Sequence, residues 1–286
     1  EAINILERQS KNSVNSEEAL HKLAQIYYSQ KEFQKSLSVI NVSLQKSRLD
    51  EHAISLKAKN LIALKQNKEA KRQLDILLSL WSKDARNLLI LSRLQLRLND
   101  FSGAESSLEM SYEMESRAFP VIINLIKLKI KLNKLSEASK ILAKAERAGF
   151  QNNVSLILLK GDIEVAKNNF NVAFKHYSAV LKIEDTNVIA LVKLSHISHS
   201  ETLSTKFIDR LTFLVDKYPE SNLQRHIFAD HLLDHKKFDQ AKLQYRLLIT
   251  KDITTSDRAL ALNNLAIVYL QENAYESAVE VSKQAF

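Results

Sequence analysis

Small and apolar residues recur along this chain at an interval close to 34 residues. One series consists of small residues, most of them followed four positions later by an apolar one: Ala2, Ser36, Ala70, Ala104, Ala138, Ala173, Ala241 and Ala278. The interval from Ala173 to Ala241 is twice 34, and Phe207 stands at the skipped position. A second series of aromatic residues or leucine lies three residues before most of these: Phe33, Phe101, Leu135, Phe170, Phe238 and Tyr275. Such a period predicts a repeated structural element.

Each period has room for two amphipathic helices joined by a short turn, and the composition favours helices throughout. Only three glycines and two prolines occur in 286 residues. Sheet proteins and dinucleotide-binding folds need glycine at tight turns and phosphate loops, so both are disfavoured. We therefore predict an all-α chain that forms one continuous array over residues 1–286. The predicted repeats cover 1–16 (partial), 17–50, 51–84, 85–118, 119–153, 154–187, 188–221 (degenerate), 222–258 and 259–286 (partial).

Three stretches show the motif most clearly: "LHKLAQIYYSQKEFQKSLSVINVSL" at 20–44, "LLKGDIEVAKNNFNVAFKHYSAVL" at 158–181 and "LNNLAIVYLQENAYESAVEVSKQA" at 262–285. Their length, small residues and aromatic positions resemble the tetratricopeptide repeat (TPR). This resemblance implies a right-handed α-solenoid, or superhelix, of about eight helix pairs, in which the first helix of each repeat lines an inner groove that binds ligands. Two departures from the motif are Ile126, at a small-residue position, and the repeat at 188–221, which keeps mainly Pro219 and is expected to pack irregularly.

Both ends of the sequence resemble cuts within a longer array. Ala2 lies one period before Ser36, so "EAINILERQ" is expected to be the second helix of a repeat whose first helix is missing. The repeat at 259–286 stops while its second helix still has an apolar face. Because solenoid ends need capping, we expect a fragment that can self-associate through its uncapped ends.

Charge is distributed unevenly along the chain. The net charge is +8, and residues 1–150 contain 25 Lys and Arg against 17 Asp and Glu, whereas residues 151–286 contain 16 of each. This asymmetry points to an anionic partner for the first half, although a solvated basic surface would give the same composition. No apolar stretch is long enough to span a membrane.

The sequence contains few features that are typical of an enzyme. Cysteine is absent, and the common nucleotide-binding, zinc-protease and nucleophile-elbow motifs are missing. We therefore predict neither catalysis nor a cofactor. His231 and His235 stand four residues apart, near His226, which is a spacing that can hold a metal. A third ligand is not dictated by the sequence, so no metal site is assigned, and a solvated helix face is the alternative.

The ninth position of each repeat is expected to face the inner groove. It is occupied by Gln25, Lys59, Arg93, Lys127, Asp162, His196, Asp230 and Ile267. Arg97 and Lys131 lie one turn after two of these cations, on the same helix face. We predict that Lys59, Arg93, Arg97, Lys127 and Lys131 bind an acidic segment of a partner protein. The later repeats carry Asp162, His196, Asp230 and Asp234 instead, so the groove is expected to change sign.

A non-enzymatic scaffold for protein–protein interaction is the function that these patterns favour. The "LNNLA" repeat resembles the TPR proteins of bacterial exopolysaccharide and PEP-CTERM/exosortase systems, which implies export or assembly in the cell envelope (periplasm) rather than in the cytoplasm. The alternative is a helical-repeat domain of a nucleic-acid-associated or transcription-regulating protein. It is less favoured because the cationic positions lack interleaved aromatic residues. Polysaccharide binding would need exposed groove aromatics, and Trp81 is expected in the core.

Overall fold

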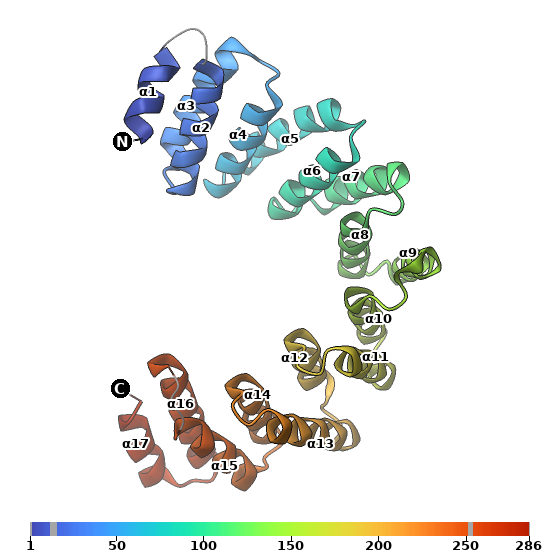
Figure 1. Cartoon of the computed structure of the whole chain (residues 1–286), viewed down its shortest axis with the longest axis vertical. Coiled ribbons are helices and arrows are strands. Elements are labelled where there is room, and N and C mark those ends of the chain that lie inside the picture. The colour runs from blue at the N-terminus through green and yellow to red at the C-terminus, as the bar shows by residue number, and fades with distance from the viewer. Residues whose placement is uncertain (1, 12–15, 251–253, 286) are drawn as a thin grey trace. The chain divides into compact units, whose positions relative to one another are not determined.

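The computed structural model describes residues 2–11, 16–250 and 254–285 and, within these, contains seventeen α-helices and no strand (Figure 1). The helices of the first half are α1 (Ala2–Lys11), α2 (Ser16–Ser29), α3 (Phe33–Lys46), α4 (Glu51–Ala63), α5 (Asn67–Trp81), α6 (Ala85–Arg97), α7 (Phe101–Met114), α8 (Phe119–Lys131) and α9 (Leu135–Ala145). A short segment, Glu146–Phe150, follows α9, and Gly149 within it has a positive φ of 103° that breaks the helix. The remaining helices are α10 (Val154–Ala166), α11 (Phe170–Ile183), α12 (Val188–Ile197), α13 (Glu201–Lys217), α14 (Asn222–Asp234), α15 (Phe238–Ile249), α16 (Thr255–Gln271) and α17 (Tyr275–Lys283).

The chain divides into two compact units, Glu1–Ile141 and Leu142–Phe286, called here the N-terminal and C-terminal units. Within each, first and second helices of successive repeats alternate, and consecutive helices pack on one another, as in α2–α3, α6–α7 and α10–α11. The core of the C-terminal unit is one large apolar cluster that includes Tyr177, Phe207 and Tyr245. The N-terminal unit has several smaller clusters, one of them around Leu74, Trp81 and Leu91. No helix in the described residues has the length and apolarity needed to cross a membrane.

Local sequence signals set where the helices start and turn. The Asp50 side chain caps α4 by accepting a hydrogen bond from the Ala53 amide, and Asp84 caps α6 in the same way from Arg86 and Asn87. The turn inside most helix pairs contains one residue with a left-handed backbone, φ between 56° and 63°. These residues recur at the repeat interval: Lys31, Lys65, Asn99, Asn133, Asn168, Lys236 and Asn273. A left-handed residue ends a helix and lets the chain reverse direction.

The small-residue series marks the closest helix contacts. Ser36, Ala70, Ala104, Ala138, Ala173 and Ala241 are fully buried, and Ala278 is nearly so. A larger side chain at these positions would separate two packed helices. Ala2, the first member of the series, is exposed.

The repeat at 188–221 departs from this arrangement. Phe207 occupies the small-residue position and is fully buried, with its ring edge-on to His231 at 4.9 Å between centroids. An aromatic ring there prevents close approach, and α12 and α13 touch much less than the helices of pairs such as α10–α11 and α14–α15. Instead, α13 packs on α14. The turn between α12 and α13 also lacks a residue with positive φ.

Candidate partner-binding surface

The five predicted binding cations lie on three successive first helices of the N-terminal unit: Lys59 on α4, Arg93 and Arg97 on α6, and Lys127 and Lys131 on α8. We call them the cationic set, and we call the exposed side of the first helices the inner face. Arg93, Arg97, Lys127 and Lys131 are exposed, and Lys59 is half-buried. α4 packs beside α6, while α7 lies against both α6 and α8. The repeat period therefore places Lys59, Arg93 and Lys127 at the same position of three successive first helices, and Arg97 and Lys131 lie one turn further along two of them.

None of the five forms an ion pair within the described part of the chain. Many other surface cations do, for example Lys35 with Glu32 and Arg72 with Glu69. Lys131 contacts an aromatic ring instead, with its Nζ 4.1 Å from the centroid of Phe101. A cation–π contact holds the ammonium in place without neutralising it. The cationic set is thus available to an anion.

A pocket of about 480 Å³ lies beside Lys59, between α2, α4 and α6. Tyr28, His52, Leu56 and Ile90 give it an apolar and aromatic wall. Trp81 also lines the pocket, and its indole nitrogen donates a hydrogen bond of 2.6 Å to Glu51. The sequence placed Trp81 in the core, and its side chain is indeed buried, yet one surface of it lines this pocket. An apolar side chain next to an acidic group would fit here.

In the C-terminal unit, two of the four residues at the ninth position, Asp162 and Asp230, form hydrogen bonds that join helices. Asp162 accepts hydrogen bonds of 2.6 Å from the hydroxyl of Tyr177 on α11 and from the ammonium of Lys193 on α12. Burial and the carboxylate raise the pKa of Tyr177 above its ordinary range. Asp162 thereby ties three helices together.

Asp230 repeats this arrangement one double period later. It accepts a hydrogen bond of 2.6 Å from the Tyr245 hydroxyl on α15 and one of 3.1 Å from Asn264 on α16. The two tyrosines stand four residues after Ala173 and Ala241, where the N-terminal unit has aliphatic residues. Tyrosine therefore accompanies aspartate, and aliphatic residues accompany the basic or amide side chains at the ninth position.

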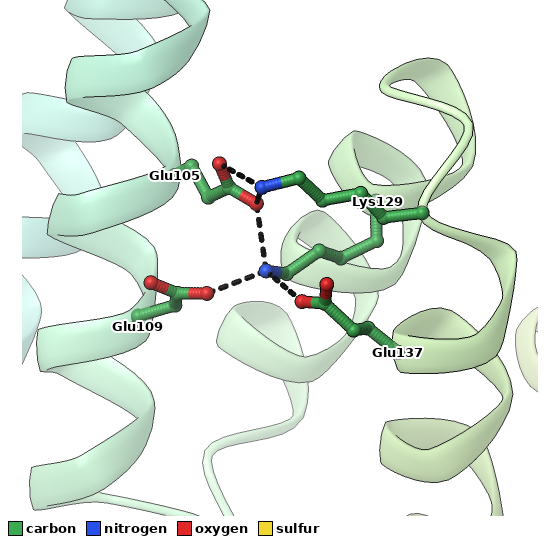
Figure 2. A network of polar contacts seen from close by, with 5 residues as sticks. Glu105, Glu109, Lys129 and Glu137 are labelled. Carbon is green, nitrogen blue, oxygen red and sulfur yellow. Dashed lines mark hydrogen bonds and ion pairs between the residues drawn. The ribbon is translucent and has the colours of Figure 1, made fainter.

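The sequence did not reveal a buried lysine on α8. Lys129 is 2% exposed, and its ammonium lies 2.5–2.7 Å from carboxylate oxygens of Glu105 and Glu109 on α7 and Glu137 on α9 (Figure 2). Lys134 makes a further ion pair with Glu105. Burial alone would lower the pKa of Lys129, but hydrogen bonds to the three carboxylates outweigh it and raise that pKa. No local pattern marked this lysine as buried, because the equivalent positions of other repeats hold both apolar or aromatic residues and polar ones: Tyr27, Leu61, Leu232 and Tyr269, but also Gln95, Glu164 and Ser198.

The carboxylates around Lys129 are also the only group of three or more close potential metal ligands in the residues that the structure describes. The Lys129 ammonium already supplies the cation at their centre. The histidines do not form such a group, since His226, His231 and His235 fail to bring three ring nitrogens within 4.8 Å of one another. His231 is buried against Ser204 and lies 4.4 Å from the His235 ring, and burial, with the neighbouring His235 and His199, lowers its pKa to about 4.

Comparisons with known proteins support one class of repeat. The family model "Anaphase-promoting complex, cyclosome, subunit 3" matches residues 1–77, and "Tetratricopeptide repeat" matches residues 228–285. No curated protein sequence gives a match. A TPR protein from Parabacteroides merdae superposes with a TM-score of 0.60 at 12% identity, over 89% of this chain and 99% of that one.

Two further solved structures are similar in fold. Yeast Tom70 gives a TM-score of 0.58 at 16% identity, over 95% of this chain and 58% of its own. The C-terminal part of a TPR repeat-containing protein from Cytophaga hutchinsonii gives 0.57 at 10% identity, over 91% and 98%. The predicted all-α solenoid is thus confirmed, and the matches support the TPR superfamily, whose members are typically non-catalytic scaffolds for protein–protein interaction. Neither matched family is described as an enzyme.

Proposed function

We propose that this chain is a non-enzymatic scaffold that binds an acidic segment of a partner protein on the inner face of its N-terminal unit. Its contacts would be the cationic set, Lys59, Arg93, Arg97, Lys127 and Lys131. The observation that carries the proposal is the contrast between the units. Cations at the ninth position of three successive repeats have no acidic partner in the described chain, whereas Asp162 and Asp230 at the same position join helices.

The geometry favours carboxylates as the ligand. Arginine presents a planar fork that matches a carboxylate, and two arginines, Arg93 and Arg97, stand one turn apart on α6. Several like charges on one surface superpose their fields and attract an anion before contact. Exposed charges alone bind loosely and are screened by salt.

Apolar contacts must therefore supply the specificity. Ile62, Leu89 and Leu96 lie close to the cationic residues in the sequence, but all three are half-buried against the apolar core. The pocket beside Lys59 is better suited, because its lining residues His52 and Ile90 are exposed and Tyr28 is partly so. We therefore refine the ligand to an acidic segment that carries an apolar anchor residue.

The wider role that we propose is the organisation of an assembly, in bacterial exopolysaccharide or PEP-CTERM/exosortase export. The resemblance of the "LNNLA" repeat supports this narrower role, together with a place in the cell envelope. The solved structures named above share the fold at low identity and bear on the architecture alone.

Double charge reversal tests the binding surface. Labelled peptides with alternating Glu and Leu residues, and matched peptides with Lys in place of Glu, are titrated against the chain. We expect the Glu peptide alone to bind the N-terminal unit, and Arg93→Glu with Lys127→Glu to weaken its binding by at least about a hundredfold, because each reversal replaces an attraction with a repulsion. Thermal stability should change little, since exposed charges contribute little to folding.

The matched control is Lys83→Glu with Lys140→Glu, which makes the same change in net charge at two other exposed positions of this unit. Equal weakening by both double variants would show a general effect of net charge and would contradict the proposal. Binding of duplex DNA that competes with the Glu peptide, and exceeds it in affinity, would favour the nucleic-acid alternative instead.

A further inference from the structure

A row of exposed apolar side chains crosses the inner face of the C-terminal unit. Ile189, Leu223 and Leu260 occupy the second position of three successive repeats and are 56%, 45% and 51% exposed. α12 packs beside α14, and α14 beside α16, so the three residues stand on adjacent helices (Figure 1). Val192 and Ile267, also exposed, lie on the same helices. We call these five residues the apolar row.

The described first helices of the N-terminal unit carry no comparable row. At the second position of its repeats the chain carries polar residues or proline: Glu18, His52, Arg86 and Pro120. Among the described residues of α2, α4, α6 and α8, Ile90 is the one large apolar side chain that is clearly exposed. Single exposed apolar residues are ordinary on protein surfaces, but a contiguous group marks an interaction site.

The charges next to the apolar row are inverted relative to the cationic set. Asp230 and Asp234 on α14 hold the ninth and thirteenth positions, where α6 has Arg93 and Arg97. Asp230 accepts hydrogen bonds from the neutral groups of Tyr245 and Asn264, which leave its charge intact. Asp234 is exposed and has no ion pair in the described chain. On α16, Asp257 and Arg258 offset each other.

Together with the proposed scaffold role, on which this inference rests, the row and its charges define a second ligand. We propose that the inner face of the C-terminal unit binds an amphipathic helix of a partner protein, with an apolar stripe flanked by lysine or arginine. The stripe packs on Ile189, Leu223 and Leu260, and the basic residues face Asp230 and Asp234. The two units of one chain thus select segments of opposite charge.

The repeat spacing predicts the ligand's pattern. Packed helices lie about 8–10 Å apart, and successive members of the row stand on neighbouring helices. A ligand helix laid across them rises about 10.5 Å over seven residues. Its apolar residues should therefore recur every seven positions. On α14, the second position (Leu223) and the ninth position (Asp230) are separated by the same rise of about 10.5 Å. This separation is close to the diameter of one helix, so a ligand helix that packs on Leu223 can place a basic side chain near Asp230.

Designed peptides test this proposal on the full chain. The probe is an eighteen-residue helical peptide with three leucines seven positions apart and flanking lysines. One comparison peptide has glutamates in place of the lysines, and another has serines in place of the leucines. We expect the leucine–lysine peptide to bind best. The triple variant I189S/L223S/L260S should weaken it by at least about tenfold, or about 1.4 kcal/mol.

The charge contact has its own variant and control. Asp234→Lys should weaken the leucine–lysine peptide and improve the leucine–glutamate peptide, while Asp216→Lys, at an exposed site on α13, should alter neither. The double variant L243S/L247S removes two exposed leucines of the outer helix α15 and should leave binding unchanged.

Three outcomes would overturn the proposal. They are no binding of the leucine–lysine peptide, equal binding by the triple variant, and concentration-dependent dimerisation that the triple variant abolishes, because the last would assign the row to a second copy of the chain. Arg93→Glu with Lys127→Glu should not affect this peptide. The failure of either site is thus distinguishable from failure of the other.

Discussion

Lys129 carries a buried charge that is acceptable only because three carboxylates surround it. A buried ion pair contributes little net stability compared with a well-packed apolar group, but the loss of one partner is costly because the other charges remain. Here the remaining charges would be like charges brought together by α7 and α9. The cluster therefore fixes how α7, α8 and α9 meet within the N-terminal unit.

We expect Lys129→Met to lower the free energy of unfolding by about 2–4 kcal/mol at neutral pH, because three carboxylates then repel one another without a counter-charge. Lys134→Met, which removes only the exposed pair with Glu105, should cost about 0–1 kcal/mol. Urea unfolding followed by circular dichroism measures both changes. A cost at Lys129 no larger than at Lys134 would show that the carboxylates relax into water.

The loss of stability in Lys129→Met should depend on pH in a defined way. Hydrogen bonds to Lys129 lower the pKa of Glu137, and those to Lys129 and Lys134 outweigh burial to lower the pKa of Glu105. Their contribution to wild-type stability is present above the unfolded pKa of Glu, about 4.5, and is lost as the pH falls through the lowered folded values. In Lys129→Met the carboxylates gain from protonation instead, so the deficit should shrink towards pH 4.

Individual side-chain contacts were the part of this protein that the sequence revealed least. The cations at Arg93 and Lys127 could be placed on one face from their spacing alone. The cage around Lys129 requires three helices to meet, and Asp162 meets Tyr177 and Lys193 from two other helices. Such meetings depend on how helices pack, which no local pattern encodes.

At the scale of the helices, the turns within most pairs share a left-handed residue, but the type of residue at this position varies. Four of the seven left-handed residues are asparagine and three are lysine. Left-handed backbone costs an ordinary residue roughly 1–2 kcal/mol, and asparagine tolerates it better. Lys31, Lys65 and Lys236 therefore bear a local strain that Asn99 and Asn133 avoid.

Lys65→Asn, at φ 59° between α4 and α5, should stabilise the protein by about 0.5–1 kcal/mol by relieving this strain. The identical substitution at Lys140, exposed in the middle of α9, should destabilise it by about 0.5 kcal/mol, because asparagine is a poorer helix former than lysine. Thermal unfolding of the two variants measures whether each substitution raises or lowers the stability. A loss of stability at Lys65 would show that its side chain makes contacts worth more than the strain.

Most of the helical architecture could be predicted from the period. Six helices, α4, α6, α8, α10, α12 and α14, begin at the residues expected for repeat starts, and the small residues of the first series other than Ala2 are buried where helices approach. The pattern also identified 188–221 as irregular. It did not show why, since only the packing reveals that Phe207 fills the gap between α12 and α13 and meets His231.

At the scale of the whole chain, the basic excess of the first half has a structural counterpart. The inner face of the N-terminal unit is cationic, and that of the C-terminal unit is apolar and acidic. The sequence predicted the change of sign but not the apolar row, because Ile189, Leu223 and Leu260 could equally have belonged to the core. Exposure is a property of the folded unit, and the helical period alone leaves it undecided for residues near a helix start.

The two ligand peptides should respond differently to salt. Raising the sodium chloride concentration from about 50 to 500 mM shortens the Debye length severalfold. Binding of the Glu peptide should weaken by about tenfold or more, while binding of the leucine–lysine peptide should weaken much less, since apolar burial is not screened. Fluorescence anisotropy at a series of salt concentrations gives both slopes. Equal slopes would mean that the two faces do not differ in the chemistry that we assign to them.

The hydrogen bond between a tyrosine and the aspartate at the ninth position has a consequence for how such an array diversifies. Arrays of this kind are built of nearly equivalent repeats. Each added repeat must pack against its neighbours and also present exposed residues that a ligand can contact. In repeats with Tyr177 or Tyr245 the phenol donates a hydrogen bond to the carboxylate, so the ninth position joins two helices. Asp230 accepts its bonds from Tyr245 and Asn264 through one oxygen, Oδ1, which leaves the other oxygen to face the ligand proposed above. Where leucine stands instead, as at Leu74 and Leu108, this hydrogen bond is absent, and in the scaffold role that we propose the ninth position contacts a ligand. We therefore expect that two substitutions in one repeat, at the ninth position and at the tyrosine that bonds to it, can convert a contact between helices into a ligand contact without changing the fold.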